Sequence, residues 1–207
     1  MIPKGPPHYW QDAKDYLRRI DPVLANIIDQ YEDPPLTSRG DLLYTLSYSI
    51  VGQQISAKAA AAIWARLIQL ISPLNTQNIL DTPLEQLRDI GLSKRKCEYL
   101  KNIAQFVAES TDINWIELTE KEIYQKLIQI KGVGPWTIHM VQIFTLCLPD
   151  VLPLQDIAVI RAIEKNYRNA ERLTLDEVEA IAAPWRPYRT VAIWYLWRTI
   201  DSEPVEY

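Results

Sequence analysis

The sequence predicts an all-α fold, and two observations carry that prediction. Apolar residues recur every three or four positions through nearly all of the 207 residues, and no segment sustains the two-residue alternation of a half-buried strand. Proline, glycine and helix-capping residues punctuate almost every junction between these segments. We therefore expect helices near residues 10–20, 22–31, 39–52, 56–71, 76–80, 83–90, 93–109, 119–130, 135–146, 156–166, 175–182 and 187–201.

The clearest boundary signals flank the eighth and ninth expected helices. Thr119 and Glu122 form a capping-box pattern at the start of the eighth. Pro135 suits the first position of the ninth, and Pro149 closes it. The segment between them is therefore a short connection between two helices.

That connection, KGVG, is a glycine hairpin. Gly132 and Gly134 bracket Val133, so the chain can turn sharply with positive φ and present bare backbone N–H groups to an anion. We expect Val133 to pack the hairpin onto its helices. Taken alone, the motif also fits an ordinary tight turn between helices.

Composition indicates a compact globular protein inside the cell. The chain is 48% hydrophobic and long enough for one large or two small cores. Charges interrupt its apolar runs before they reach membrane-spanning length, and MIPKGPPHYW has no apolar signal region. We expect the cytoplasm of a prokaryote or the nucleus of a eukaryote. Cys97 and Cys147 are too few for an iron-sulfur cluster, so we interpret both as reduced core residues.

The net charge opposes nucleic-acid binding. The formal charge is −4, whereas domains that bind DNA electrostatically are usually basic. Local clusters soften this objection, although charge runs commonly mark exposed helix faces. The basic residues near the motifs are Lys94, Arg95, Lys96, Lys101, Lys131, Arg161, Arg186 and Arg189.

The motif KGVGPWT, followed by PDVLPLQD, resembles the helix-hairpin-helix (HhH-GPD) DNA glycosylases, specifically the 3-methyladenine DNA glycosylase II branch. Blocks at 49–67 (SIVGQQISAKAAAAIWARL) and 183–197 (APWRPYRTVAIWYLW) resemble the same branch, as do DPVLANII and IGLSKRKCEYL. The resemblance implies the HhH-GPD fold, with two helical lobes and an active-site cleft between them. One lobe would span 41–150 and hold the helix-hairpin-helix motif at 119–147. The other would combine 1–40 with 151–207.

The resemblance makes Asp156 the catalytic carboxylate. The residues themselves predict a helix N-cap at Asp156, and the two roles are compatible because both hold the carboxylate in place. Releasing a purine builds positive charge on deoxyribose, which a fixed negative charge stabilises. Asp150 does not match the family position, so we interpret it as a turn residue.

Trp136 sets the expected reaction subtype. In family members that also nick DNA, this position is a lysine that forms a Schiff base with the sugar. Lys131 lies before the hairpin, facing phosphate, and is a poor substitute. We expect a monofunctional enzyme that uses water and leaves an abasic site.

The remaining implied roles concern DNA contact. Most aromatic residues are expected in the core, but the resemblance places Trp197 at the base-stacking position, with Trp136 and Tyr44 nearby, where they would attract cationic alkylated bases. Gln54 matches the wedge that fills the hole left by the flipped base, and Gln53 is placed to bond the opposite base. The expected backbone contacts are Lys131, Gly132, Val133, Gly134 and Thr137.

No cofactor is expected beyond a structural Na⁺ or K⁺ held by carbonyls of Gly132 and Gly134. The expected partner is double-stranded DNA containing alkylated bases, bound by a monomer away from membranes. Two alternatives stay open: a noncatalytic helix-hairpin-helix DNA-binding module, and a helical protein-interaction domain. The second would not need Gly132, Gly134 and Asp156 in their family positions.

Overall fold

The computed structural model describes residues 2, 4–31 and 34–201, and within this part of the chain the secondary structure is helical. The only pairing of extended backbone there is one antiparallel bridge, between Gly5 and Ser38. No described helix is both long and apolar enough to span a membrane. The helices are α1 (Trp10–Ile20), α2 (Pro22–Gln30), α3 (Leu42–Gly52), α4 (Ala57–Leu70), α5 (Thr76–Asp81), α6 (Leu84–Asp89), α7 (Lys94–Glu109), α8 (Glu120–Leu127), α9 (Pro135–Phe144), α10 (Ile157–Tyr167), α11 (Leu175–Ala182), the 3₁₀-helix η1 (Ala183–Trp185) and α12 (Arg189–Arg198).

The expected helices are all found, and their ends follow capping residues. The bounds of α1 and α11 agree with the prediction. The expected start of α3 was three residues early, because the Asp41 side chain accepts a hydrogen bond from the Tyr44 amide (3.0 Å) and begins the helix at Leu42. The 3₁₀-helix η1 was not predicted, since three residues carry no periodicity.

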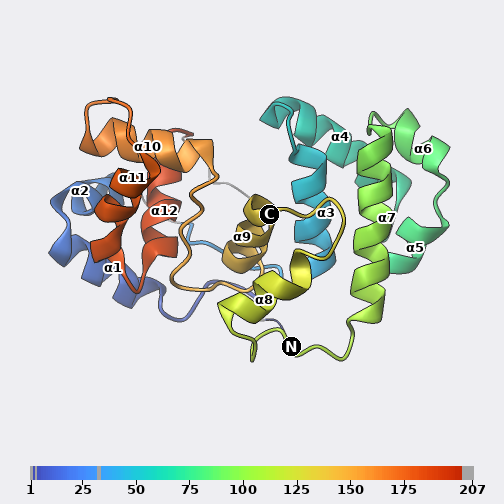
Figure 1. Cartoon of the computed structure of the whole chain (residues 1–207), viewed down its shortest axis with the longest axis horizontal. Helices are drawn as coiled ribbons and strands as arrows, with labels where there is room; N and C mark the ends of the chain where they lie inside the picture. Colours follow the sequence, from blue (N-terminus) through green and yellow to red (C-terminus); the bar gives the residue numbers. More distant parts are fainter. Residues whose placement is uncertain (1, 3, 32–33, 202–207) are drawn as a thin grey trace. The chain divides into compact units, whose positions relative to one another are not determined.

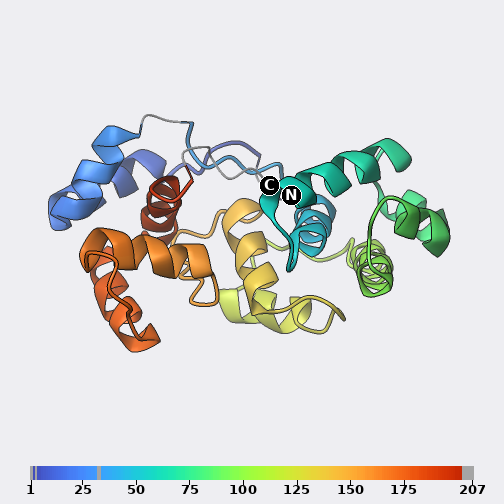
Figure 2. The same cartoon turned by 90° about the horizontal axis from the view of Figure 1, so that it is seen from above.

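The described chain divides into two compact units, and the first consists mainly of residues 40–141. Within it, α7 packs against α3, α5 and α6, and α3 packs against α4 (Figure 1). Figure 2 looks nearly along the axis of α7, drawn in green. The buried faces supply fully buried Leu46, Ile50, Leu100 and Ile103. The long α7 is therefore the support on which this unit is built.

The second unit combines the described residues among 4–39 with residues 142–201, and so joins an N-terminal and a C-terminal part of the chain. Its central element is α12, which packs against α1, α2 and α10. Buried aromatic side chains, among them Trp185 and Tyr195, fill its core. Residues 142–150, expected in the first lobe, group with this second unit, and the boundary falls within α9.

Both cysteines are free and buried, in agreement with the prediction that they are core residues. Burial raises the pKa of the Cys147 thiol to about 11, so it stays protonated at neutral pH.

Candidate functional site

α8, the glycine hairpin and most of α9 lie in the first unit, where α8 leads into α9. The predicted capping box is present: the Glu122 amide donates to Thr119 Oγ1 (3.3 Å), and the Thr119 amide donates to Glu122 Oε2 (2.8 Å). The Thr119 hydroxyl also donates to Glu122 Oε2 (2.7 Å), and this bond together with that from the Thr119 amide lowers the pKa of the Glu122 carboxyl. The helix that precedes the hairpin is thus firmly capped at its N-terminus.

The two hairpin glycines differ in backbone conformation and in the space available for a side chain. Gly132 has a φ of +104°, and a Cβ there would overlap the ring of Tyr99 on α7. Gly134 has no positive φ, and a Cβ there would meet nothing within 4 Å. The expectation of positive φ was therefore wrong for Gly134, whose backbone is compatible with a side chain. The fold requires glycine at the first position and leaves the second open.

The hairpin is braced from several directions. Val133 is 6% exposed, as expected of a residue that anchors the turn. The Gln53 side chain donates from Nε2 to the Gly132 carbonyl (3.2 Å) and to Thr137 Oγ1 (3.4 Å). Asn102 on α7 donates to the Lys131 carbonyl (3.4 Å). Thr137, expected at the DNA backbone, is buried at 1% exposure, so its side chain holds the turn instead.

The loop between α3 and α4 carries the expected wedge residues, and the structure separates their roles. Gln54 is exposed at the tip with a left-handed backbone (φ +57°), an uncommon conformation for a residue with a side chain. Ile55 beside it is 38% exposed. Gln53 is half-buried and donates from its side-chain amide to the hairpin, so part of its hydrogen-bonding capacity is used within the fold, and its contact with the opposite base stays a prediction.

Two lysines expected near the DNA surface are used inside the fold. Lys96 Nζ donates to the carbonyls of Val51 (2.8 Å) and Gln53 (2.7 Å), where α3 ends. Lys101 Nζ donates to three carbonyls around the end of α5, among them that of Ile79 (2.7 Å). Burial lowers the pKa of both lysines. The exposed cations left in this set are Lys94, Arg95, Lys131, Arg161 and Arg186.

Asp156, in the second unit, is the N-cap of α10. Its Oδ1 accepts hydrogen bonds from the amides of Ala158 (2.8 Å) and Val159 (3.0 Å), and the residue is 9% exposed. The Asp156 amide in turn donates to the Pro153 carbonyl (2.9 Å). The N-cap prediction is confirmed, and the carboxylate is fixed at the positive end of a helix dipole.

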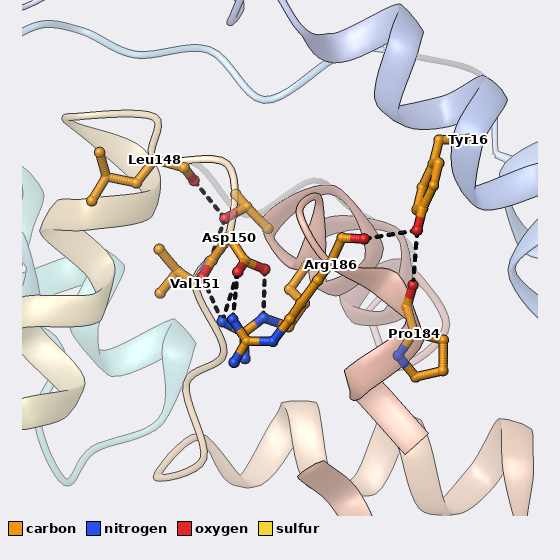
Figure 3. Close-up of polar contacts among 8 residues, drawn as sticks. Tyr16, Leu148, Asp150, Val151, Pro184 and Arg186 are labelled. Atoms are coloured by element: carbon orange, nitrogen blue, oxygen red, sulfur yellow. Dashed lines mark hydrogen bonds and ion pairs between the residues drawn. The ribbon is translucent and has the colours of Figure 1, made fainter. Parts of the chain in front are cut away.

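Asp150 is neutralised by two arginines, which agrees with a turn role. Its carboxylate accepts from Arg189 Nε (2.5 Å) and Nη2 (3.0 Å) and from Arg186 Nη1 (2.9 Å; Figure 3). Arg189 is 7% exposed. A carboxylate bound in this bidentate way has its charge and its oxygens already engaged, so it is a poor stabiliser of a substrate cation. Arg189, one of the basic residues near the motifs, is therefore engaged inside the fold.

The expected base-pocket aromatics lie in different units. In the second unit, Trp197 is 5% exposed and stacks on Phe144, with centroids 5.7 Å apart and planes inclined by 17°. In the first unit, the Trp64 ring meets Tyr44 edge to face at 4.9 Å and donates from Nε1 to the Tyr44 hydroxyl (3.3 Å). Trp136 is half-buried in the first turn of α9.

The hairpin carbonyls expected to hold a cation already accept hydrogen bonds. The Gly132 carbonyl accepts from Gln53, and the Gly134 carbonyl accepts from the Ile138 amide (3.0 Å). Each carbonyl oxygen has a second lone pair, so both remain able to bind a monovalent cation.

An all-helical fold with a braced glycine hairpin and a capped downstream aspartate is the pattern of helix-hairpin-helix DNA repair proteins. The model of the HhH-GPD superfamily of base excision DNA repair proteins matches residues 48–187. DNA-3-methyladenine glycosylase 1 of Schizosaccharomyces pombe is 31% identical over 190 residues, which cover 85% of this chain and 80% of that protein. A DNA-3-methyladenine glycosylase of Bacillus subtilis is 27% identical over 215 residues, covering 93% and 70%.

A solved structure agrees. The 3-methyladenine DNA glycosylase of S. pombe in complex with abasic DNA matches with a TM-score of 0.82 and 28% identity, over 91% of this chain and 96% of that one. The chain therefore belongs to the HhH-GPD superfamily of base excision DNA repair proteins.

Proposed function

We propose that this protein is a monofunctional DNA glycosylase that releases alkylated purines, such as 3-methyladenine and 7-methylguanine, from duplex DNA. The observation that carries the proposal is Asp156, fixed by two backbone amides at the start of α10. Relatives named as DNA-3-methyladenine glycosylases support the substrate class.

The negative charge of the Asp156 carboxylate stabilises the sugar during the reaction. As the glycosidic bond lengthens, deoxyribose becomes oxocarbenium-like, and a preorganised carboxylate stabilises that charge without reorganising at the moment of reaction. Asp156 also orients the attacking water. An alkylated purine leaves without a dedicated general acid, because its ring already carries positive charge.

Water is the nucleophile. Trp136 occupies the position of the lyase lysine in nicking relatives, and an indole cannot form a Schiff base. Lys96 and Lys101 donate their ammonium groups to backbone carbonyls, so neither is an available amine. The product is an intact strand with an abasic site.

The DNA is held by the backbone of the glycine hairpin and by the wedge residue Gln54. Gly134, with open space around its Cα, lets a phosphate approach the hairpin amides, and Lys131 adds a nearby cation. Gln54 fills the space left by the flipped nucleotide. A hairpin that binds phosphate through neutral amides explains how a chain of net charge −4 can bind DNA. A Na⁺ or K⁺ ion at the carbonyls of Gly132 and Gly134 would add positive charge there.

The flipped base is received by aromatic rings. Phe144 covers one face of Trp197, so a base stacks on the opposite face. In the first unit, the proposed base contacts are Trp136 and Tyr44, whose hydroxyl accepts a hydrogen bond from Trp64. Such rings favour cationic bases through cation–π attraction, which gives specificity for charge and broad tolerance of shape. We expect the protein to act as a monomer on DNA inside the cell.

A panel of duplexes tests the function. Each carries one lesion, 3-methyladenine, 7-methylguanine, ethenoadenine or hypoxanthine, and is incubated with the protein, then analysed with and without alkaline cleavage. Strand breaks that appear only after alkali, with no complex trapped by borohydride, are expected. Breaks without alkali, or a trapped complex, would exclude water attack, and binding without release from any duplex would favour the noncatalytic DNA-binding module.

A further inference from the structure

The turn at residues 148–151, which leads from α9 towards Asp156, is held by the first two residues of α12. Thr190 Oγ1 donates to the Leu148 carbonyl (2.6 Å) and accepts from the Val151 amide (3.1 Å). The Thr190 amide donates to the Pro149 carbonyl (3.0 Å). Figure 3 shows Leu148, Asp150 and Val151 gathered at these contacts.

Arg189 completes the hold on the same turn. Besides the bidentate contact with the Asp150 carboxylate, its Nη2 donates to the Asp150 carbonyl (2.9 Å). Side chain and backbone of one turn residue are thus bound by a single guanidinium. Arg189 is almost fully buried, and a buried charge is costly unless it is paired in good geometry. Such a pair is better suited to fixing a conformation than to adding net stability.

Little freedom remains between this turn and the aspartate. Val151, Leu152 and Pro153 are buried, and the Asp156 amide donates to the Pro153 carbonyl (2.9 Å). The same α12 carries Trp197 eight residues after Arg189, about 12 Å along the helix at 1.5 Å per residue. One helix therefore sets both the turn before Asp156 and the ring expected to stack on the base.

We propose that Arg189 and Thr190 are positioning residues that act on Asp156 through the 148–151 turn and set its place relative to Trp197. This inference rests on the proposed function, in which Asp156 is the catalytic carboxylate. Neither residue touches the sugar. They determine the position of the Asp156 carboxylate. A displacement of a reacting group on the order of 1 Å can lower the reaction rate roughly a hundredfold.

Thr190→Val removes both hydrogen bonds of the hydroxyl at nearly constant side-chain volume. Arg189→Lys keeps the positive charge but loses the planar guanidinium that binds Asp150 in a bidentate way. We expect each to lower the single-turnover rate of 7-methylguanine release roughly ten- to a hundredfold, with affinity for an abasic-site analogue nearly unchanged. Thr190→Ser keeps the hydroxyl and should restore most of the rate. The amides of Ala158 and Val159, which bind Asp156, should exchange hydrogen faster in Thr190→Val.

Tyr167→Phe is the matched control, because it removes a partly buried hydrogen bond to Asp21 Oδ2 (2.8 Å) at the far end of α10. It should lower the melting temperature and leave the rate of base release unchanged. A normal rate in Thr190→Val and Arg189→Lys, or an equal loss in Tyr167→Phe, would overturn the positioning role while leaving the glycosylase function standing. A wild-type protein that releases no alkylated base would instead overturn both.

Discussion

Gly132 and Gly134 make a matched pair that separates folding from DNA binding. Gly132→Ala places a Cβ into the Tyr99 ring and a side chain at a φ of +104°. A residue held in such a region costs on the order of 1–3 kcal/mol, and displacing the ring adds to this. For a protein of this size each kcal/mol shifts the melting temperature by roughly 2–4 °C, so the backbone strain alone should lower it by about 2–12 °C.

Gly134→Ala should behave in the opposite way. Its φ is compatible with alanine, and the added Cβ meets nothing within 4 Å, so the variant should fold normally and gain about 0.4–1 kcal/mol by restricting the unfolded chain. If a phosphate approaches this backbone, the methyl group disrupts charge-assisted hydrogen bonds worth about 1.5–3 kcal/mol. Affinity should then fall roughly ten- to a hundredfold.

The assay is fluorescence anisotropy on duplexes with and without an abasic-site analogue, alongside thermal melting. Because backbone contacts carry no sequence information, Gly134→Ala should weaken all duplexes alike. Unchanged affinity in a folded Gly134→Ala protein would refute the reasoning and leave the hairpin a structural turn. A Gly132→Ala protein as stable as wild type would refute the account of Tyr99.

Three further predictions concern other parts of the protein. Gln53→Ala should weaken duplex binding roughly two- to tenfold, the equivalent of one neutral hydrogen bond, whichever base lies opposite the lesion; dependence on that base would restore a base-reading role. Trp197→Phe, chosen because alanine would leave a cavity against Phe144, should slow release of cationic 7-methylguanine more than release of neutral hypoxanthine, and equal losses would leave only shape and stacking. Because burial raises the pKa of Cys147 from 9.0 to about 11, its thiol stabilises the folded state fully below pH 9.0, and this stabilisation, on the order of 3 kcal/mol, is lost as the pH rises through about 11. Cys147→Ala should therefore reduce the fall in melting temperature between these two pH values. An unchanged fall would mean that another group titrates there.

Helix positions could be predicted because their signals are local. The Thr119 and Glu122 capping box begins α8 as its sequence pattern predicts, and Asp156 caps α10 through its own side chain. Val133 could be assigned to the interior of the hairpin because its neighbours are both glycine. Such features depend on residues within one helical turn of each other.

The errors have a different physical origin. From the sequence, Lys96 is expected to be a surface cation. The direction of its side chain is instead set by the carbonyls of Val51 and Gln53, more than 40 positions away. Gly132 needs to be glycine because of Tyr99, which no local pattern marks. Arg189 and Asp150 lie 39 residues apart, and only tertiary structure brings them together. A sequence names the residues of a site more readily than their partners.

The central claim is that Asp156 drives base release. The most direct measurement is the single-turnover rate of 7-methylguanine release by wild type and Asp156→Asn on the same duplex, with affinity for an abasic-site analogue measured in parallel. The asparagine keeps an oxygen that can cap α10, so the variant should fold and bind, while release falls at least about a hundredfold through loss of the charge. Near-normal release by a folded Asp156→Asn protein would contradict the account.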